Sequence, residues 1–279
     1  MTSDHDLTDL LHAAELARST YYYHRARLNT PDKHARLKAE ITRLFDDHKR
    51  RFGYRRIHLV LRRQGWAVSK KLVWKLMAQL GLQSKVRRKR AYSSYRGTVS
   101  HIADNTLDRE FQTGLPNTKW VSDVTEFRVA GRKVYLSPIY DLCDHSVLSY
   151  TTATSPTTKF TAQSLQEALA IHNPQQGLLV HTDQGFHYQH GSWTSQLVAH
   201  HAEQSMSRKD NCFDNAVMEN FFGHLKAEMY HGEHFATVDD FLHELDDYMG
   251  YYNTQRVQEG LEGMTPTEYR NHALEQQTA

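Results

Sequence analysis

Three acidic side chains occupy positions that are unusual for surface carboxylates. Asp123 interrupts the apolar run WVSDVT, and Asp183 ends the short run LLVHTD just before a glycine turn. Glu219 lies in NAVMENFFGHLKAEMYH, where aliphatic and aromatic residues recur at helical spacing. An unpartnered carboxylate is costly in apolar surroundings, so these positions indicate a role beyond solubility.

These residue types suit the chemistry of a phosphodiester bond. Magnesium prefers oxygen ligands, and two divalent cations roughly 4 Å apart can neutralise a phosphate, activate the attacking oxygen and stabilise the departing one. We therefore predict that Asp123, Asp183 and Glu219 are catalytic and bind Mg²⁺, for which Mn²⁺ can substitute. Singly, each acid is better explained as a surface carboxylate or a helix salt bridge, so the prediction depends on the set.

The helix expected around Glu219 has a polar edge. At about 100° per residue, Asn215, Glu219 and Lys226 fall within an arc of about 40°. The apolar residues of the same helix fall on the neighbouring face. The edge therefore places an amide, a carboxylate and a cation where they can touch both metal and DNA phosphate.

Histidines near Asp183 offer a different metal chemistry. His181, Asp183, His187 and His190 are close in sequence, and histidine is a common zinc ligand. However, the spacing brings no further histidine or cysteine to them, and Asp183 would have to serve a different chemistry. Zinc is the weaker interpretation of this segment.

Charge is distributed very unevenly along the 279 residues. Residues 1–100 contain 23 Lys and Arg against 8 Asp and Glu, whereas residues 101–279 contain 11 against 24. Such basic segments attract polyanions, because each Lys or Arg set against a phosphate releases condensed counterions. We expect the first part to bind DNA; a lysine-rich solvated surface is the alternative.

Helical periodicity organises the basic part. Residues 7–17 and 20–27 predict two short helices, either a helix-turn-helix outline or an ordinary helical hairpin. Further helices are expected from residue 34, over 54–65 and over 68–82; the last has the character of a groove-reading helix. The residues expected to contact DNA here are Arg55, Arg56, Lys70, Lys71 and Lys75.

A basic stretch without periodicity follows at residues 85–106. It begins with KVRRKR and shows neither an apolar stripe nor a strand pattern, which indicates a linker. We expect it to touch the DNA backbone, and a solvated linker is the alternative. The contacts would come from Arg87, Arg88, Lys89 and Arg90.

The remaining residues alternate between strand and helix patterns. The β-rich runs are 120–129, 133–142, 146–155, 177–183 and 203–208. The helical runs are 157–172, 192–202, 215–231 and 239–255. This order predicts an α/β fold with a mixed five-stranded sheet and covering helices.

The cysteine content and the hydropathy of the sequence indicate in which cellular compartment the protein is expected. Cys143 and Cys212 are the only cysteines and lie far apart, so neither a disulfide framework nor a cysteine-rich zinc module is available. We find no run of about 18 apolar residues and no secretory leader. We expect a cytoplasmic protein.

Several motifs together point to a family. WVSDVTEF, HTDQGFHY and SMSRKDNCFDNAVMENFFGHLKAE resemble the integrase-like transposases of bacterial insertion sequences. The 35 residues between Asp183 and Glu219, with Lys226 seven after Glu219, resemble the insertion-sequence-three family and its second-reading-frame (OrfB-type) product. GYRRIHLVLRRQGWAVSKKLVWKLMAQLGL and the tail YYNTQRVQEGLEGMTPTEYR are similar to the same family, so the resemblance spans residues 19–270.

The resemblance implies a fold and residue roles. The fold is RNase H-like, as in retroviral integrases, and the three acids bind the metals. Lys226 contacts the terminal DNA, and Arg208 and Asn215 match positions beside the site, where they are expected to contact DNA. Trp120 and Tyr252 are packing or stacking residues.

Two positions depart from the family pattern. Asp210 stands where relatives often have glycine, and Gln258 where many have a basic residue or histidine. Asp210 either weakens DNA binding or is a harmless turn residue. The expected divisions are a helix-turn-helix-like segment (1–30), a helix-turn-helix DNA-binding domain (31–84), a basic linker (85–114) and an integrase-like catalytic domain (115–275).

The resemblance implies a magnesium-dependent polynucleotidyl transferase. It would release a 3′-hydroxyl at an element end and join that hydroxyl to a second phosphodiester. The alternatives are a regulator that binds DNA without catalysis and an RNase H-like nuclease whose nucleophile is water. The implied partners are DNA, further copies of the chain, and an upstream-frame product, present as a frameshift fusion in many relatives. The expected location is the cytoplasm, with the nucleoid.

Overall fold

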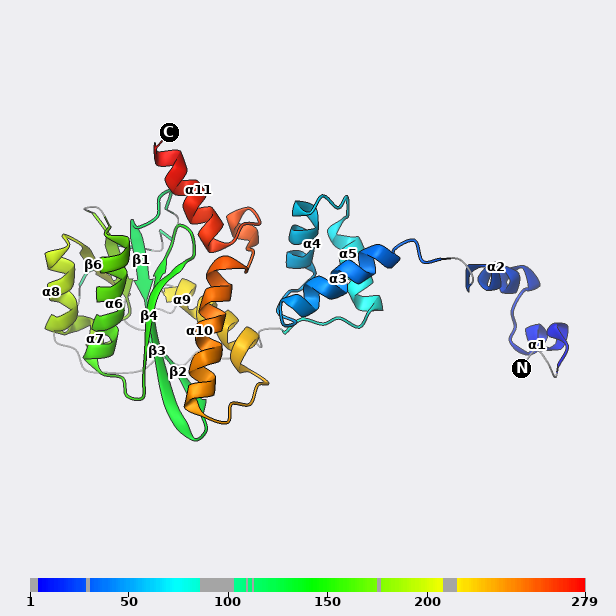
Figure 1. The fold of residues 1–279 in the computed structure, drawn as a ribbon, viewed down its shortest axis with the longest axis horizontal. Helices are drawn as coiled ribbons and strands as arrows, with labels where there is room; N and C mark the ends of the chain where they lie inside the picture. The colour runs from blue at the N-terminus through cyan, green and yellow to red at the C-terminus, as the bar shows by residue number, and fades with distance from the viewer. Residues whose placement is uncertain are drawn as a thin grey trace.

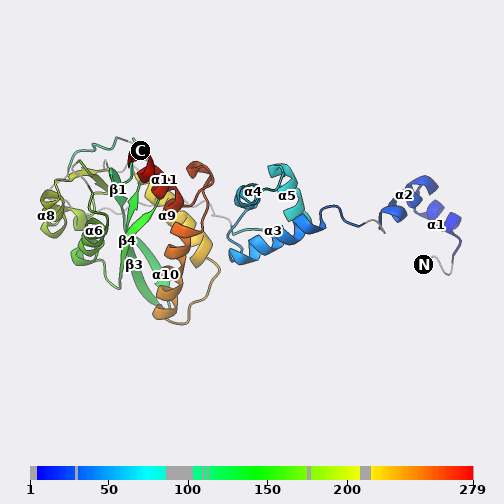
Figure 2. The same cartoon turned by 45° about the horizontal axis from the view of Figure 1, so that its top comes forward.

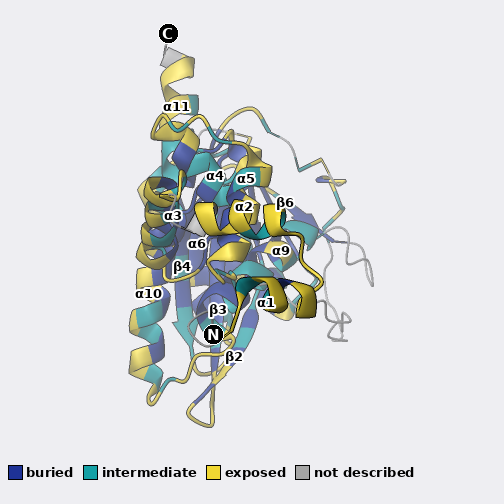
Figure 3. Ribbon diagram, turned by 90° about the vertical axis from the view of Figure 1, so that its right-hand side faces the viewer, coloured by how far each residue is buried: buried dark blue, intermediate teal, exposed yellow. Residues whose placement is uncertain are grey.

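The computed structural model begins with two short helices that lie apart from the rest. It describes residues 5–28, 31–85, 103–108, 110–111, 113–174, 177–207 and 215–278. Helix α1 (Leu7–Ala13) is capped by Asp6, whose Oδ1 accepts the Thr8 N–H, and it contacts α2 (Arg18–Leu28). Both lie away from the sheet in two views (Figures 1 and 2), and most of their residues are exposed (Figure 3). The two predicted helices are confirmed.

The next three helices form a compact unit around an apolar centre. They are α3 (Ala35–Asp47), α4 (Tyr54–Arg63) and α5 (Lys70–Gln79). Their buried residues include Ile41, Phe45, Ile57, Leu61, Val73 and Leu76. Gly65, at φ +87°, lets the chain turn after α4, and the Ser69 hydroxyl caps α5 by accepting the Leu72 N–H at 3.2 Å. The predicted helices and their buried faces are confirmed.

Six strands form one mixed sheet. They are β1 (Lys119–Ser122), β2 (Thr125–Val129), β3 (Arg132–Asp141), β4 (Val147–Ala153), β5 (Leu179–Thr182) and β6 (Glu203–Met206). β3 pairs with β1 and β2 along one edge and with β4 along the other, β1 pairs with β5, and β5 pairs with β6. Strands β1, β5 and β6 are parallel, whereas the pairs with β3 are antiparallel.

The predicted five-stranded sheet is wrong by one strand, because the run 120–129 is interrupted. β1 and β2 follow the same edge of β3 in one register, Ser122 opposite Ile139 and Thr125 opposite Leu136. That register sets Asp123 opposite Pro138, which has no backbone N–H to donate to a ladder. The Asp123 carboxylate instead accepts the Val124 N–H at 2.7 Å, so the acid lies between two strands.

Helices cover both faces of this sheet (Figure 1). On one side lie α6 (Thr158–His172), α7 (Phe186–Gln189) and α8 (Gly191–Ala199), which bury the core that contains Trp120 and Trp193. On the other lie α9 (Ala216–Leu225), the π-helical turn η2 (Lys226–Tyr230) and α10 (Val238–Thr254). Their core is continuous with that of α3–α5, so the helical unit and the sheet share one apolar cluster.

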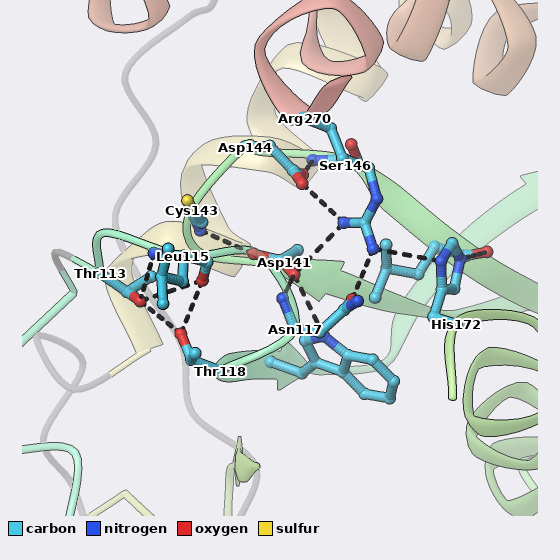
Figure 4. Close-up of polar contacts among 12 residues, drawn as sticks. Thr113, Leu115, Asn117, Thr118, Asp141, Cys143, Asp144, Ser146, His172 and Arg270 are labelled. Atoms are coloured by element: carbon cyan, nitrogen blue, oxygen red, sulfur yellow. Dashed lines mark hydrogen bonds and ion pairs between the residues drawn. The ribbon is translucent and has the colours of Figure 1, made fainter. Parts of the chain in front are cut away.

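The last helix is fixed to the sheet by Arg270. After the short turn η3 (Glu259–Leu261), Arg270 in α11 (Pro266–Thr278) donates to Asp144 at 2.6 Å and to Asn117 at 2.5 Å (Figure 4). Its Nη1 also lies 3.5 Å from Asp141 at the end of β3. Burial, followed by the charge of Asp144, raises the pKa of Asp141 to about 6. This cluster lies at the start of β1, the end opposite Asp123.

None of the described helices is both long and apolar enough to cross a membrane.

Candidate active site

Asp123 and Asp183 occupy equivalent positions on neighbouring parallel strands. β1 pairs with β5 in a register that sets Lys119 opposite Leu179 and Val121 opposite His181. Each aspartate follows the last residue of its strand, so the same register sets Asp123 opposite Asp183. Adjacent strands lie about 4.8 Å apart, which brings the two carboxyl groups to one edge of the sheet.

Gly185 leaves room for the Asp183 carboxylate. Asp183 Oδ1 accepts the Gly185 N–H at 2.8 Å. A Cβ at Gly185 would lie 2.8 Å from that same oxygen, closer than non-bonded atoms approach. The missing side chain at Gly185 therefore lets the carboxylate lie against this N–H group, whereas the backbone of Gly185, at φ −59°, is one that any residue adopts.

Asn215 holds the other aspartate. Its Nδ2 donates to Asp123 Oδ2 at 2.8 Å, while Asp123 Oδ1 accepts the Val124 N–H. Asn215 precedes α9; its predicted contact with DNA stays a prediction, and the contact found is with the carboxylate of Asp123. Its Oδ1 is buried and has no hydrogen-bond partner among the described residues.

Burial is the main cause of the raised pKa of both aspartates, Asp123 and Asp183. Burial, then the Asp183 charge, raises the pKa of Asp123 well above its ordinary value, and the Asn215 hydrogen bond only partly offsets this. Burial also raises the pKa of Asp183, against the lowering effect of the Gly185 hydrogen bond. A cation bound beside them would lower the pKa of both carboxyl groups.

Glu219 lies in the first turn of α9, within electrostatic reach of Asp123. Its charge also raises the pKa of Asp123. Among the described residues, however, no three His, Cys, Asp or Glu side chains come together as a metal-binding group. The structure thus unites Asp123 with Asp183 and places Glu219 within electrostatic reach of Asp123 without closing a three-ligand set.

The predicted DNA-contacting residues around the site are only partly described. Lys226, the first residue of η2, places its ammonium 5.2 Å from the centre of the Phe127 ring, a cation–π contact. Arg208 lies outside the described residues, and so does Asp210, one of the two positions that differ from the family pattern. The four cations predicted in the linker also lie outside them: Arg87, Arg88, Lys89 and Arg90. The other position that differs from the family pattern is Gln258, whose Oε1 accepts a hydrogen bond from His145 Nδ1 at 3.1 Å.

The histidines of the zinc interpretation are occupied separately. His181 is buried between the hydroxyls of Ser205 and Ser207, at 2.8 and 3.1 Å. His190 caps α8, because its Nδ1 accepts the Ser192 N–H. His187 packs against the Phe186 ring. In the part of the chain that the structure describes, no three of these side chains come together as a metal-binding group, so the zinc interpretation gains no support.

The cations predicted to bind DNA in the helical unit fall into two groups. Arg56 donates to Glu228 at 2.9 Å and Lys70 pairs with Glu259, so both have contacts within the chain. Arg55, Lys71 and Lys75 are exposed. Whether any of the five contacts DNA stays a prediction, and the second group is the better placed.

An ion network behind α9 was not predicted from the sequence. Glu228 is 3% exposed and accepts hydrogen bonds from Arg256, Arg56 and the Tyr248 hydroxyl. Burial raises the pKa of Glu228, but the charges of Arg256 and Arg56 outweigh it and lower that pKa to about 2. The available indication was the one used for Asp123, an acid inside an apolar run, here AEMY.

Family models match most of the chain. Residues 32–90 match an HTH-like domain, and residues 115–212 and 219–274 match two models of an integrase core domain. The predicted fold class, an integrase core preceded by a helix-turn-helix region, is confirmed. Among solved structures, the simian T-cell lymphotropic virus intasome bound to a PP2A regulatory subunit aligns with a TM-score of 0.49 and 16% identity, over 82% of this chain and 74% of that chain.

Curated relatives cover nearly the whole chain. It is 43% identical over 265 residues to transposase InsK of insertion sequence element IS150 from Escherichia coli K12, covering 95% of this chain and 93% of that protein. It is 31% identical to transposase InsF of IS3A from the same organism, covering 93% and 92%. A transposase of IS1353 from Shigella flexneri is 38% identical, but the chain spans only 52% of its length. The chain therefore belongs to the IS3-family insertion-sequence transposases, as an OrfB-type product.

Proposed function

We propose that this transposase cuts DNA at an insertion-element end in a Mg²⁺-dependent reaction and transfers the 3′-hydroxyl to a second phosphodiester. One observation carries the proposal: Asp123 and Asp183 follow the ends of adjacent parallel strands in register, and Glu219 is within electrostatic reach of Asp123. Nothing in the arrangement favours a regulator without catalysis.

The donor set fits a hard divalent cation. Asp123, Asp183 and Glu219 supply only oxygen ligands, and a bound cation would oppose the effect of burial, which raises the pKa of both aspartates. These three side chains would hold Mg²⁺, or Mn²⁺ in its place. When bound, the metal would polarise the scissile phosphate and lower the barrier to attack by an oxygen nucleophile.

The chain's own residues position this chemistry. Gly185 and Val124 N–H groups hold one oxygen of each aspartate, and the Asn215 amide holds the second oxygen of Asp123. Two of the three acids are thereby oriented before substrate arrives, which lowers the cost of reaching the reactive geometry. Lys226, which follows α9, would contact a DNA phosphate.

The other predicted partners belong to the same proposal. The exposed cations of the helical unit would grip DNA without sequence preference, and joining two ends requires more than one copy of the chain. End recognition would be shared with an upstream-frame product, separately or as a fusion. The proposed division stays 1–30, 31–84, 85–114 and 115–275.

The test is a strand-transfer assay. A labelled duplex that ends in the element's terminal sequence is incubated with Mg²⁺, with and without the upstream-frame product. Wild type is expected to join the 3′ end to a second duplex. Asp183→Asn and Glu219→Gln should each reduce joining at least about 100-fold. The matched control is Glu203→Gln, an exposed carboxylate on β6, which should act like wild type.

Each contrary result has a distinct meaning. Joining that survives both triad substitutions would rule out this active site. Cleavage to a shortened product without joining would identify a nuclease. DNA binding with neither reaction, even with the upstream product present, would leave only the regulator.

A further inference from the structure

The outer face of α5 carries an exposed tryptophan between lysines. Lys71, Trp74, Lys75 and Ala78 are all exposed and recur at helical spacing, so they form one stripe opposite the buried side of the helix. Trp74 is 56% exposed, whereas two of the other three tryptophans are fully buried. We call these four residues the α5 stripe.

The position of α5 as the second helix of a helix-turn-helix indicates what the α5 stripe would face. Gly65 ends the turn after α4, and Ser69 starts α5, so the two helices form the helix-turn-helix within residues 32–90. In such modules the second helix enters the major groove of duplex DNA. The α5 stripe is the part of that helix left uncovered by α3 and α4.

The charges on the stripe select a polyanion. No ion pair joins Lys71 or Lys75 to any other residue that the structure describes, whereas Lys70, on the same helix, pairs with Glu259. Lys71 and Lys75, at positions i and i+4, can reach phosphates. Phosphate binding alone, however, gives no role to the exposed indole ring of Trp74 between them. The partner must therefore be anionic at its edges and apolar at its centre.

Duplex DNA has this combination in its major groove. The thymine 5-methyl group is the apolar feature exposed there, between the two phosphate backbones. We propose that Trp74 is a specificity-determining residue that contacts a thymine methyl group, while Lys71 and Lys75 hold the flanking phosphates. The inference rests on the proposed function only for its choice of DNA as ligand, and it is independent of the catalytic triad.

The first experiment identifies the preferred sequence. A pool of 30-base-pair duplexes with randomised central positions is selected for binding to the full chain, in EDTA so that no strand is cut. Wild type is expected to enrich at least one fixed thymine. Trp74→Ala should lose that preference, while Trp74→Phe, which keeps an aromatic ring, should retain most of it.

The second experiment isolates the methyl group. The selected duplex is compared with one in which the enriched thymine is replaced by uracil, which lacks only that methyl, by fluorescence anisotropy at several salt concentrations. Wild type should bind the uracil duplex about fivefold more weakly, whereas Trp74→Ala should bind both equally. The double variant Lys71→Ala/Lys75→Ala should lower the salt slope by about two and keep the uracil effect.

Three outcomes would overturn the proposal. The first is equal uracil sensitivity in wild type and Trp74→Ala. The second is a wild-type pool without any enriched thymine. The third is self-association lost in Trp74→Ala with DNA selectivity unchanged, which would make the stripe a subunit interface. Urea unfolding of Trp74→Ala and of Val198→Ala, an exposed apolar residue on the catalytic part, controls for folding. A failed strand-transfer assay would not affect this comparison, because it measures binding alone.

Discussion

Arg56 and Glu228 join the helix-turn-helix unit to the helix that carries Glu219. The Arg56 Nη1 donates to Glu228 Oε1 at 2.9 Å, and Glu228 lies in η2, the π-helical turn that continues α9. Arg51 adds a second link to Glu244 in α10 at 2.8 Å. π-Helical turns are uncommon and are often found at functional sites. The helix-turn-helix unit is thus joined by ion pairs both to η2, which continues α9, and to α10.

Removing the Glu228 charge should strongly destabilise the protein. In Glu228→Gln, Arg256 is left as a buried cation without its anion, so we expect the free energy of unfolding to fall by roughly 3–5 kcal/mol. Arg56→Ala should have a smaller effect, because Arg256 still neutralises Glu228. Urea denaturation measures both. The control Arg43→Ala breaks an exposed pair with Glu40 and should lose under about 1 kcal/mol; equal losses in Glu228→Gln and Arg43→Ala would contradict the network.

The same carboxylate predicts an acid-dependent loss of stability. Glu228 has a pKa of about 2 when folded and an ordinary value of 4.5, so the unfolded chain binds more protons between these values. Its contribution is therefore complete above pH 4.5 and is lost as the pH falls toward 2. The difference in unfolding free energy between wild type and Glu228→Gln should be constant from pH 7 to 5 and shrink below 4.5. A difference that stays constant down to pH 3 would contradict this assignment.

A single methyl group at Gly185 should damage catalysis more than folding. The added Cβ of Gly185→Ala would meet Asp183 Oδ1 at 2.8 Å, so the carboxylate must move. Displacements of about 1 Å at reacting groups can reduce rates as much as 100-fold, and we expect strand transfer to slow by about 10- to 100-fold. Gly191→Ala is the matched control, since nothing lies within 4 Å of its Cβ. Equal transfer rates in the two variants would show that Gly185 does not set the position of Asp183.

Divalent cations should stabilise the folded chain. Binding at Asp123 and Asp183 relieves their mutual repulsion, and a ligand at 100 times its dissociation constant adds about 2.7 kcal/mol. Thermal unfolding of wild type should therefore shift upward with Mg²⁺ and with Mn²⁺. Asp183→Asn should show much less of this shift, whereas Glu203→Gln should shift like wild type. An undiminished shift in Asp183→Asn would place the metal elsewhere.

The sequence alone was sufficient for features that depend on neighbours in the chain. Apolar spacing predicted the helices of residues 34–82, because one helical face must be buried whatever lies opposite it. Asp123 and Asp183 were predicted as acids that interrupt or end apolar runs, and Glu219 as part of a polar helix edge with Asn215 and Lys226; that the three are catalytic stays a prediction. The family motifs then implied a transposase, which the relatives confirm.

Only the tertiary structure decided which distant residues meet. The register of β1 on β5 sets Asp123 opposite Asp183, and Pro138 on a third strand divides the run that contains Asp123. Likewise, no local pattern pairs Arg56 with Glu228, so a cation predicted to bind DNA was found in an ion pair within the chain. Strand register, burial and electrostatic fields are sums over elements far apart in sequence, and they exist only once those elements have packed.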